Sequence, residues 1–600
     1  MFQTFESPVR PEDGPPRLAR LRHRMAGQGL SAFLVPRTDA HQGEFVAARD
    51  ERLSWLTGFT GSAGFCAVLA DAAGVFIDGR YRLQVKQQVD TAHFTPVPWP
   101  ETALDDWLKQ RLTAGATVGY DPWLHSHHQI SALQKALAGA GITLIATDNP
   151  VDLIRDDLPA APTGQVAVHP PEHAGESHDS KRSRLSAALR DDGLAAAVLT
   201  LPDSIAWLLN IRGSDVPRTP VVHAFAILHG DGRVDLFVAG AKLGEEVRAH
   251  LGQSVTLRPP EAFGRALHDL SGRILLDKDS VPMQVVLCLG AGAEPVFSRD
   301  PCILPKARKN PAEIAGAGKA HLRDGAAMAG FLAWLEAEAP GGGLTEIDVV
   351  RRLEGFRRAT GALRDISFDT ICGAGANGAI VHYRVTRQSN RRIRPGDLLL
   401  VDSGGQYPDG TTDITRTIAV GAVGEEERTC FTRVLQGMIA MSRVRWPKGL
   451  AGRDLDALAR MPLWLAGQDY DHGTGHGVGA YLNVHEGPAR LSRLSAVPLE
   501  PGMILSNEPG YYREGAFGIR IENLVVVEPA PDLPGGDGRE MLHFRTLTYA
   551  PIDRRLIRVE MLTPAERGWL DDYHGRTLAL LEGRVSAGCR GWLRAACAPL

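Results

Sequence analysis

A pattern that occurs twice in the first half of the chain places the strongest constraint on its fold. The first copy, RLARLRHRMAGQGLSAFLV, has leucines at helical spacing, then a glycine, then an apolar run typical of a strand. The second copy, RLSAALRDDGLAAAVLTL, has the same order, and each is followed by a tryptophan-bearing segment around Trp55 or Trp207 and by further strand-like runs. The repeat predicts two related α/β domains, and chance similarity between common α/β patterns is the alternative.

The rest of the chain is long enough for a third domain. A chain of 600 residues does not form one hydrophobic core. The stretch Asn310-Pro311 followed by Glu313 has the cap, the proline and the acidic residue of a helix start. We therefore expect three domains, at residues 1–160, 161–306 with a Pro-, Gly-, Ser- and His-rich linker at about 161–182, and 307–600.

Composition excludes several classes of protein. A net charge of −4 argues against a nucleic-acid-binding protein, which would carry a basic surface. The seven cysteines are scattered and form no CxxC pair, which suits free thiols in a reducing compartment. The first 25 residues lack the apolar core of a signal peptide, and no run of about 18 apolar residues predicts a membrane span. We expect a cytoplasmic protein.

The stretch VDSGGQYPDGTTDITRT contains three aspartates with different expected roles. The YPDG sequence predicts a turn at Asp409, so the flanking runs predict a β-hairpin that carries Asp402 and Asp413. Two carboxylates that face each other on an apolar hairpin repel unless a cation lies between them. The alternatives are a divalent metal, or an aspartate that faces water and pairs with Arg416.

Histidines dominate two further segments. His382 lies in the strand-like run GAIVHYRV, where a hydrogen-bonded core histidine is the alternative to a functional one. His472, His476 and His485 lie in DHGTGHGVGAYLNVHEGP, in which glycines let the backbone approach a ligand closely. A loop that needed only conformational freedom would require the glycines but not the histidines.

Two glutamates complete the set of candidate ligands. Glu508 precedes Pro509, and an ordinary surface acid is its alternative. Glu522 lies in the apolar run GIRIENLVVV, which predicts a buried strand, and a buried carboxylate needs a partner. Arg520, on the same face, is either that partner or a residue that orients a metal-binding carboxylate.

Together these segments supply four carboxylates and one imidazole: Asp402, Asp413, His476, Glu508 and Glu522. An oxygen-rich set with one nitrogen suits two divalent ions, Mn²⁺ first and Co²⁺ or Zn²⁺ as alternatives. Two such ions about 3.5 Å apart can share and activate one water molecule.

The motifs of the chain resemble those of a known family. DAHQGEF, GFTGSAG with DGRY, DSGGQYPDGTTDITRT, HGTGHGVGAYLNVHEGP, NEPGYY and GIRIEN occur in order over nearly the whole sequence. The chain resembles the Xaa-Pro aminopeptidases, in their long, three-domain cytosolic form. These belong to the pita-bread metallopeptidases, with prolidase and methionine aminopeptidase. The resemblance implies two creatinase-like N-terminal α/β domains, a C-terminal pita-bread domain (α+β), and a homodimer formed through the catalytic domains.

The resemblance also implies roles for individual residues. Asp402 would bind one ion, Asp413 and Glu522 would bridge both, and His476 and Glu508 would hold the second, with Glu508 also taking a proton from the shared water. His485 would contact the scissile carbonyl. His382, placed with the catalytic residues, and His472 would shape the proline site. Three further residues are expected to bind substrate: Arg520, Glu44 and Arg80.

The expected function is the removal of the first residue from peptides that have a free N-terminus and proline in second position. An Xaa-Pro bond lacks the N–H that general peptidases use, and a dinuclear centre supplies an activated water and a Lewis acid. A prolidase that cleaves only dipeptides is the first alternative, although prolidases usually lack the middle domain. A peptide-binding relative without catalytic activity is the second.

Overall fold

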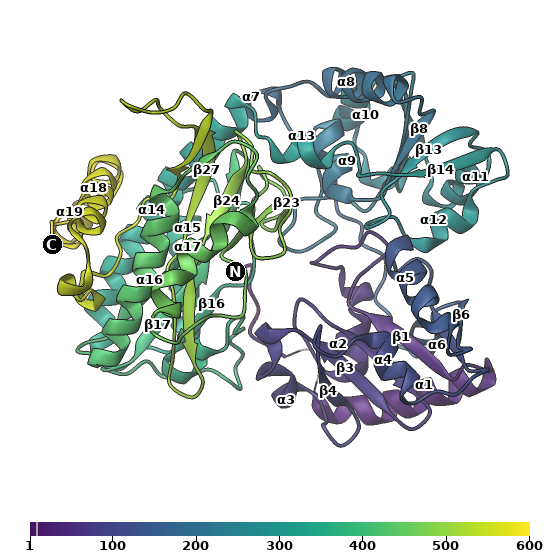
Figure 1. The fold of residues 1–600 in the computed structure, drawn as a ribbon, viewed down its shortest axis with the longest axis horizontal. Coiled ribbons are helices and arrows are strands. Elements are labelled where there is room, and N and C mark those ends of the chain that lie inside the picture. The colour runs from purple at the N-terminus through teal and green to yellow at the C-terminus, as the bar shows by residue number, and fades with distance from the viewer. Residues whose placement is uncertain (8–9) are drawn as a thin grey trace. The chain divides into compact units, whose positions relative to one another are not determined.

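The chain forms two compact units. The computed structural model describes residues 1–7 and 10–600 (Figure 1). One unit, called here the N-terminal unit, is Pro8–Ile303. The other, the C-terminal unit, joins Met1–Ser7 to Leu304–Leu600. Among the described residues, no helix has the length and apolar character needed to cross a membrane.

The N-terminal unit contains two six-stranded sheets with the same topology. Their strand orders are β4-β3-β2-β1-β5-β6 and β12-β11-β10-β8-β13-β14. In the first sheet β1 pairs antiparallel with β2 and parallel with β5. In the second sheet β8 pairs in the same way with β10 and β13. The strands are β1 (Ala32–Pro36), β2 (Phe65–Leu69), β3 (Ala73–Ile77), β4 (Thr95–Pro98), β5 (Thr117–Tyr120), β6 (Thr143–Ala146), β8 (Ala196–Leu199), β10 (Phe225–His229), β11 (Val234–Phe237), β12 (Val255–Arg258), β13 (Gly272–Leu276) and β14 (Ala293–Phe297). The predicted pair of related domains is confirmed.

The helices that open the two copies lie where the repeat predicts them. Helix α1 (Gly14–Gly27) buries Leu18, Leu21 and Met25, one apolar face that covers its sheet. Helix α8 (His178–Asp191) opens the second copy and begins inside the stretch expected to be a linker, because Ser177 caps its first turn. The other helices of eight or more residues in this unit are α5 (His127–Ala138) and α9 (Pro202–Leu209).

The described part of the C-terminal unit has six helices of eight or more residues, which Figure 1 labels beside its strands. They are α14 (Pro311–Glu338), α15 (Glu346–Arg358), α16 (Glu425–Arg443), α17 (Gly452–Trp464), α18 (Pro564–Leu581) and α19 (Ala587–Ala596). The predicted start of α14 is confirmed. The Asn310 side chain accepts a hydrogen bond from the backbone amide of Glu313, and the Glu313 side chain accepts one from the backbone amide of Asn310. Helix α14 contacts α15 and α19, and α16 contacts α17 and α18.

Two sheets of the C-terminal unit carry the site. One has the order β16-β17-β20 and the other β21-β28-β27-β24-β22-β23. Their strands are β16 (Ile371–Ala374), β17 (Leu398–Ser403), β20 (Ile414–Ala419), β21 (Arg445–Pro447), β22 (Gly475–Gly477), β23 (Glu486–Leu491), β24 (Ile504–Asn507), β27 (Asn523–Pro529) and β28 (Met541–Thr546). Smaller sheets are formed by β15 (Asp365–Ile366), β18 (Gly405–Tyr407) and β19 (Gly410–Thr411), and by β25 (Gly510–Arg513) and β26 (Phe517–Arg520).

The predicted aspartate hairpin is present with one change. Strands β17 and β20 pair antiparallel, and Asp409 lies in the turn between β18 and β19. Asp402 lies in β17, but Asp413 comes just before β20, because β18 and β19 form a separate ladder that interrupts the hairpin. The Asp409 carboxylate binds both terminal nitrogens of Arg323 at 2.9 Å.

The first seven residues contribute to the core of the C-terminal unit. Phe5 is buried among apolar side chains of α14, α15 and β17. The backbone amide of Phe2 donates to the Glu354 carboxylate, and the Gln3 side chain exchanges hydrogen bonds with the backbone of Thr370. We predicted from the sequence that these residues belong to the first domain. In the structure they belong to the C-terminal unit.

Candidate metal centre

Five predicted ligands meet where the two main sheets of the C-terminal unit approach each other. Asp402 lies in β17 and Asp413 directly precedes β20, and both strands belong to one sheet. His476 comes from β22, and Glu508 and Glu522 follow the ends of β24 and β26, next to the other sheet. The pairing of these strands therefore brings residues that are up to 120 positions apart in sequence to one place.

The side chains lie within ligand distance of one another. The His476 Nε2 atom is 3.5 Å from Asp413 Oδ2 and 3.3 Å from Glu508 Oε1. One ligand atom from each of Asp413, His476 and Glu522 lies within 4.8 Å of the others. Asp402, Asp413 and Glu522 are 7, 4 and 1% exposed, so water solvates these carboxylates poorly. The alternative pairing of an aspartate with Arg416 is wrong, because Arg416 donates to backbone carbonyls such as that of Glu522.

Three carboxylate oxygens at this place lack a hydrogen-bond partner among the described residues: Asp402 Oδ1, Asp413 Oδ1 and Glu522 Oε1. Burial, followed by the charges of neighbouring carboxylates, raises the pKa of Asp413 and of Glu522 well above their usual values. Burial is also the main reason why the pKa of Glu508 is raised. Divalent cations would satisfy these oxygens and remove the repulsion, so the residues present fit a metal centre.

Neighbouring side chains hold the candidate ligands in place. The Ser506 hydroxyl accepts from the backbone amide of His476 and donates to Glu508 Oε1, both at 3.0 Å. The Thr415 hydroxyl donates to Glu522 Oε2 at 2.8 Å. We did not predict Thr415 or Ser506, although each lies two residues from a candidate ligand and so on the same face of a strand.

The His476 ring is oriented by its own strand. Its Nδ1 atom lies 3.1 Å from the carbonyl of Gly477, which leaves Nε2 toward the carboxylates. The glycines beside His476 allow close approach of neighbouring backbone, and their predicted role in approach to a ligand stays a prediction. A Cβ atom at Gly475 would lie 1.9 Å from the carbonyl oxygen of Ser506, and one at Gly477 would lie 2.3 Å from that of Glu486.

Arg520 binds a different carboxylate from the one expected. Its guanidinium donates to Asp402 Oδ2 at 2.6 Å and to the Tyr512 hydroxyl at 2.5 Å. Glu522 is not part of one continuous strand with Arg520, because the chain leaves β26 after Arg520 and enters β27 at Asn523. Because the strand is interrupted between Arg520 and Asn523, the Glu522 side chain points toward Thr415. Arg520 instead orients the candidate metal ligand Asp402.

Two predicted pocket histidines, His472 and His485, contact this assembly. The Tyr512 hydroxyl lies 2.9 Å from His472 Nε2, so a chain of hydrogen bonds joins His472 through Arg520 to Asp402. The ring of His485 stands edge-on to the ring of His476, with centroids 4.3 Å apart.

The third histidine, His382, does not lie in a strand as expected. The chain leaves β16 for the 3-10 turn η7 (Gly375–Ala379), and His382 follows in a turn. Beyond it, only an isolated bridge joins Ile371 to Arg384. The apolar run around His382 therefore lacks the continuous partner strand that a ladder requires.

Glu44 and Arg80 lie near each other in the N-terminal unit. Burial lowers the pKa of Arg80, but Asp78, Tyr81 and Glu44 raise it by a larger amount, so this arginine lies in the field of the Glu44 carboxylate. Arg80 also forms an ion pair with Asp78 at 2.7 Å. Their expected role in substrate binding stays a prediction.

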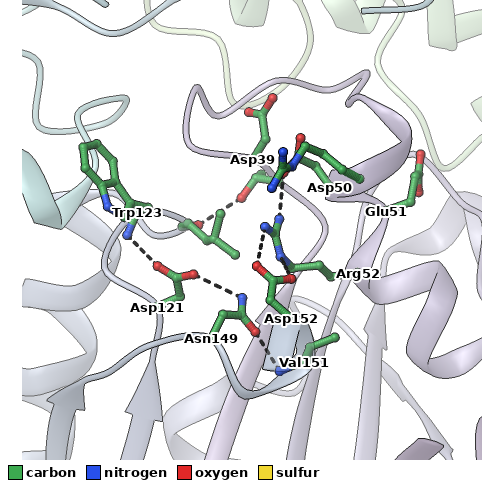
Figure 2. A network of polar contacts seen from close by, with 12 residues as sticks. Asp39, Asp50, Glu51, Arg52, Asp121, Trp123, Asn149, Val151 and Asp152 are labelled. Atoms are coloured by element: carbon green, nitrogen blue, oxygen red, sulfur yellow. Dashed lines mark hydrogen bonds and ion pairs between the residues drawn. The ribbon is translucent and has the colours of Figure 1, made fainter. Parts of the chain in front are cut away.

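The loop that carries Glu44 is anchored at both ends. At one end, Asp39 accepts from the backbone amides of His41 and Gly43 at 2.9 and 3.0 Å. At the other end, Arg52 joins Asp50 to Asp152, and Figure 2 shows this network below the loop. These contacts hold the ends of the loop in one conformation.

A buried centre of four carboxylates and one imidazole, at the meeting point of two sheets, defines a metallopeptidase of the M24 type. Comparison with protein families agrees: Metallopeptidase family M24 matches residues 316–529, and its C-terminal region matches 540–600. The Creatinase/Prolidase N-terminal domain matches twice, at 17–156 and 157–313. The chain is also 40% identical to aminopeptidase P2 of Arabidopsis thaliana, over 93% of this chain and 85% of that protein. It therefore belongs to the Xaa-Pro aminopeptidase family, as the motifs predict.

Solved structures extend this result. The X-prolyl aminopeptidase of Caenorhabditis elegans, described as a cytosolic enzyme with a di-nuclear active site, matches with a TM-score of 0.93 and 32% identity, over 98% of this chain and 99% of that one. The Xaa-Pro dipeptidase of Bacillus anthracis matches with a TM-score of 0.51 and 23% identity, over 63% of this chain and 99% of that one. The second likeness concerns the fold alone.

Proposed function

We propose that this protein removes the N-terminal residue from peptides whose second residue is proline. The observation that carries the proposal is the complete set of five candidate ligands, three of which have a buried oxygen without a hydrogen-bond partner among the described residues. Full-length similarity to Xaa-Pro aminopeptidases supports the same activity.

Two divalent cations fit the centre, as in the di-nuclear active site of the C. elegans enzyme. Asp402 would bind one ion, Asp413 and Glu522 both, and His476 and Glu508 the second. The ions would supply a water of lowered pKa and a Lewis acid for the scissile carbonyl. We propose Mn²⁺ because one nitrogen among oxygen donors suits it, with Co²⁺ or Zn²⁺ as substitutes.

The remaining residues of the pocket would bind the substrate and move protons. Glu508, which lies beside His476 in the centre, would take the proton of the attacking water. His485, which stands beside His476, would donate a hydrogen bond to the carbonyl oxygen as negative charge develops there. His382 and His472 would shape the proline site, while Arg520 would hold Asp402 and line the pocket.

The proposed preference for free N-termini depends on acidic groups other than the four ligand carboxylates, because two divalent ions would neutralise those. A free α-amine would be attracted to such a group, and an acetylated one would lose this attraction. Proline in second position is a tertiary amide with a fixed φ, so a pocket shaped for its ring selects it. Glu44 and Arg80 are proposed to assist this choice from the N-terminal unit.

Prolidase activity is the nearest alternative, and a role in peptide binding alone is the second. The match to the C. elegans X-prolyl aminopeptidase over 98% of this chain favours the aminopeptidase form. A binding-only protein would not need these buried carboxylate oxygens, which have no hydrogen-bond partner in the part of the chain that the structure describes.

Metal analysis combined with four peptides tests the proposal. The protein should contain two divalent ions per chain and hydrolyse an Xaa-Pro-Xaa tripeptide. It should leave intact the N-acetylated tripeptide and the tripeptide with alanine in place of proline. Hydrolysis of an Xaa-Pro dipeptide alone would indicate a prolidase, and absence of stoichiometric metal and turnover would indicate a binding protein. Hydrolysis of the acetylated peptide would overturn the exopeptidase assignment.

We also propose a cytosolic homodimer formed through the C-terminal unit. The resemblance implies the dimer, and the description of the C. elegans enzyme supports the location. Near the end of α17 the unit exposes Met461, Trp464 and Leu465, together with Leu494, at 51, 42, 83 and 94%. Replacing Leu465 with aspartate should produce monomers in sedimentation equilibrium, and an unchanged dimer would exclude this surface.

A further inference from the structure

Glu486 follows His485 directly in sequence and takes no part in the chemistry proposed above. Its carboxylate is 1% exposed and lies between two buried ammonium groups. Lys309, also 1% exposed, contacts Oε1, and Lys306, 3% exposed, lies 3.0 Å from Oε2. A buried ion pair contributes little to stability by itself, so this arrangement calls for another explanation.

The two lysines lie next to the start of the long helix α14 of the C-terminal unit. Lys306 lies in the short helix α13 (Ile303–Ala307), and Lys309 directly precedes the capped first turn of α14. The backbone amide of Lys309 donates to the carbonyl of Gly502 at 3.0 Å. The Glu486 carboxylate is therefore held from a helix start and not from a surface loop.

The backbone of Glu486 lies against the strand that carries the candidate ligand His476. Glu486 is the first residue of β23 and pairs with Gly477 at a register shift in β22. No side chain fits between them, because a Cβ atom at Gly477 would lie 2.3 Å from the Glu486 carbonyl oxygen. Glu486 thus fixes the point where the chain passes from His485 into the sheet.

We propose that Glu486, held by Lys306 and Lys309, is the positioning residue for His485. The two ion pairs of Glu486 keep the His485 ring edge-on to His476 and directed at the place where the substrate carbonyl would lie. The proposal rests on the proposed function, in which His485 donates to that carbonyl. Displacing a donor by about 1 Å can cost about 10²-fold in rate, so a residue that acts only through position can matter for kcat.

A double-mutant cycle on the metal-loaded protein tests this role. Lys309→Met removes one ion pair of Glu486 and leaves its pair with Lys306, so the buried carboxylate keeps a partner. Glu486→Gln removes both ion pairs. We expect each to lower kcat at least about tenfold, with KM and metal content nearly unchanged. In a His485→Ala background neither should lower kcat further, because the group that they position is absent. Equal losses in both backgrounds would show a purely structural role and overturn the proposal.

Two further measurements complete the test. Lys309→Arg should restore most of the rate, and Glu500→Gln, which breaks the neighbouring exposed pair with Arg308, should change nothing. The NMR signals of the His485 ring in the Zn²⁺-loaded protein should shift or broaden in Lys309→Met. This signal separates the two proposals: if the wild type cleaves no Xaa-Pro peptide, a shifted ring signal still supports the positioning role, and an unshifted one overturns it.

Discussion

The effect of replacing an aspartate of the C-terminal unit by asparagine depends on the role of its carboxylate. Some carboxylates there have a buried oxygen without a hydrogen-bond partner among the described residues. An aspartate that fills a cation's coordination shell cannot be replaced by its amide, which carries no charge and offers one acceptor oxygen. An aspartate that forms a turn can be replaced, because asparagine favours turns equally well. Asp413 and Asp409 are only four residues apart and belong to these two different classes.

Asp413→Asn should abolish hydrolysis of Xaa-Pro peptides and lower metal content, while Asp409→Asn should keep both. Asp409→Asn loses its ion pair with the partly exposed Arg323, so we expect a stability loss of only about 1 kcal/mol. Turnover, metal content and thermal unfolding measured on both variants check this. Equal loss of activity in two folded variants would refute the separation of the aspartates.

His485→Ala should lower kcat by about 10²–10³-fold while both metal ions stay bound. The reason is that His485 touches the ring of the candidate ligand His476 but is expected to act on the substrate carbonyl. Steady-state kinetics and metal analysis of the same preparation separate the two effects. Loss of metal together with activity, or lower stability with unchanged turnover, would make His485 a structural residue instead.

The sequence allowed the candidate ligands to be predicted because each lies in a short, chemically unusual motif. The contacts between them could not be predicted, since they depend on which strands become neighbours. Arg520 illustrates this. Two-residue periodicity suggested Glu522 as its partner, but strand β26 ends at Arg520, and the guanidinium binds Asp402. Thr415 and Ser506 went unnoticed because a hydroxyl in a strand has no distinctive local pattern.

Among whole elements, α18 depends on one buried histidine. His574 is completely buried, and its Nε2 atom accepts the backbone amide of Ile552 at 3.1 Å, which requires a neutral ring. Burial, then Arg416 and Arg554, lowers the pKa of His574 from 6.5 to about 3. The unfolded chain therefore binds a proton between pH 6.5 and 3 that the folded chain does not.

His574 should consequently destabilise the C-terminal unit as the pH drops below about 6.5. The contribution of this single group between pH 6.5 and 4 is about 3 kcal/mol. His574→Gln keeps an acceptor for Ile552 but does not titrate, so its stability should fall less over this range. Urea unfolding of both proteins at several pH values tests this, and parallel curves would show that His574 does not control docking of α18.

Elements with strong local signals were predictable, and those set by tertiary pairing were not. Helix α14 begins at its predicted cap because Asn310 and Glu313 satisfy the free amides of the first turn locally. The run around His382 has the composition of a strand but forms a turn, since a strand needs a partner that composition does not reveal. Helix α8 starts inside the polar stretch expected to be a linker because Ser177 caps its first turn, a local signal that the composition of the stretch concealed.

At the scale of the whole chain, the repeated pattern predicted two related domains correctly, but nothing local marked the docking of residues 1–7. Phe5 is 6% exposed in the core of the C-terminal unit, so Phe5→Ala should destabilise that unit by about 3 kcal/mol. Glu6→Gln, at an exposed position, should change stability by less than about 0.5 kcal/mol.

Differential scanning calorimetry of the two variants checks this expectation. The transition that the metal ions stabilise should move for Phe5→Ala and stay in place for Glu6→Gln. A transition that moves equally for both, or for neither, would show that the segment adds nothing to the core.

The docking of residues 1–7 also sets an order of events during synthesis. The amide of Phe2 reaches Glu354, a residue 352 positions later in the chain. At translation rates of about 5–20 residues per second, residues 1–7 wait about 20–70 s after their own synthesis for their binding site to be made. The domains between them can fold in that interval, while residues 1–7 complete their fold only after Glu354 has been made. A bulky group fused ahead of residue 1 should therefore impair assembly of the C-terminal unit while sparing the folding of the domains made first.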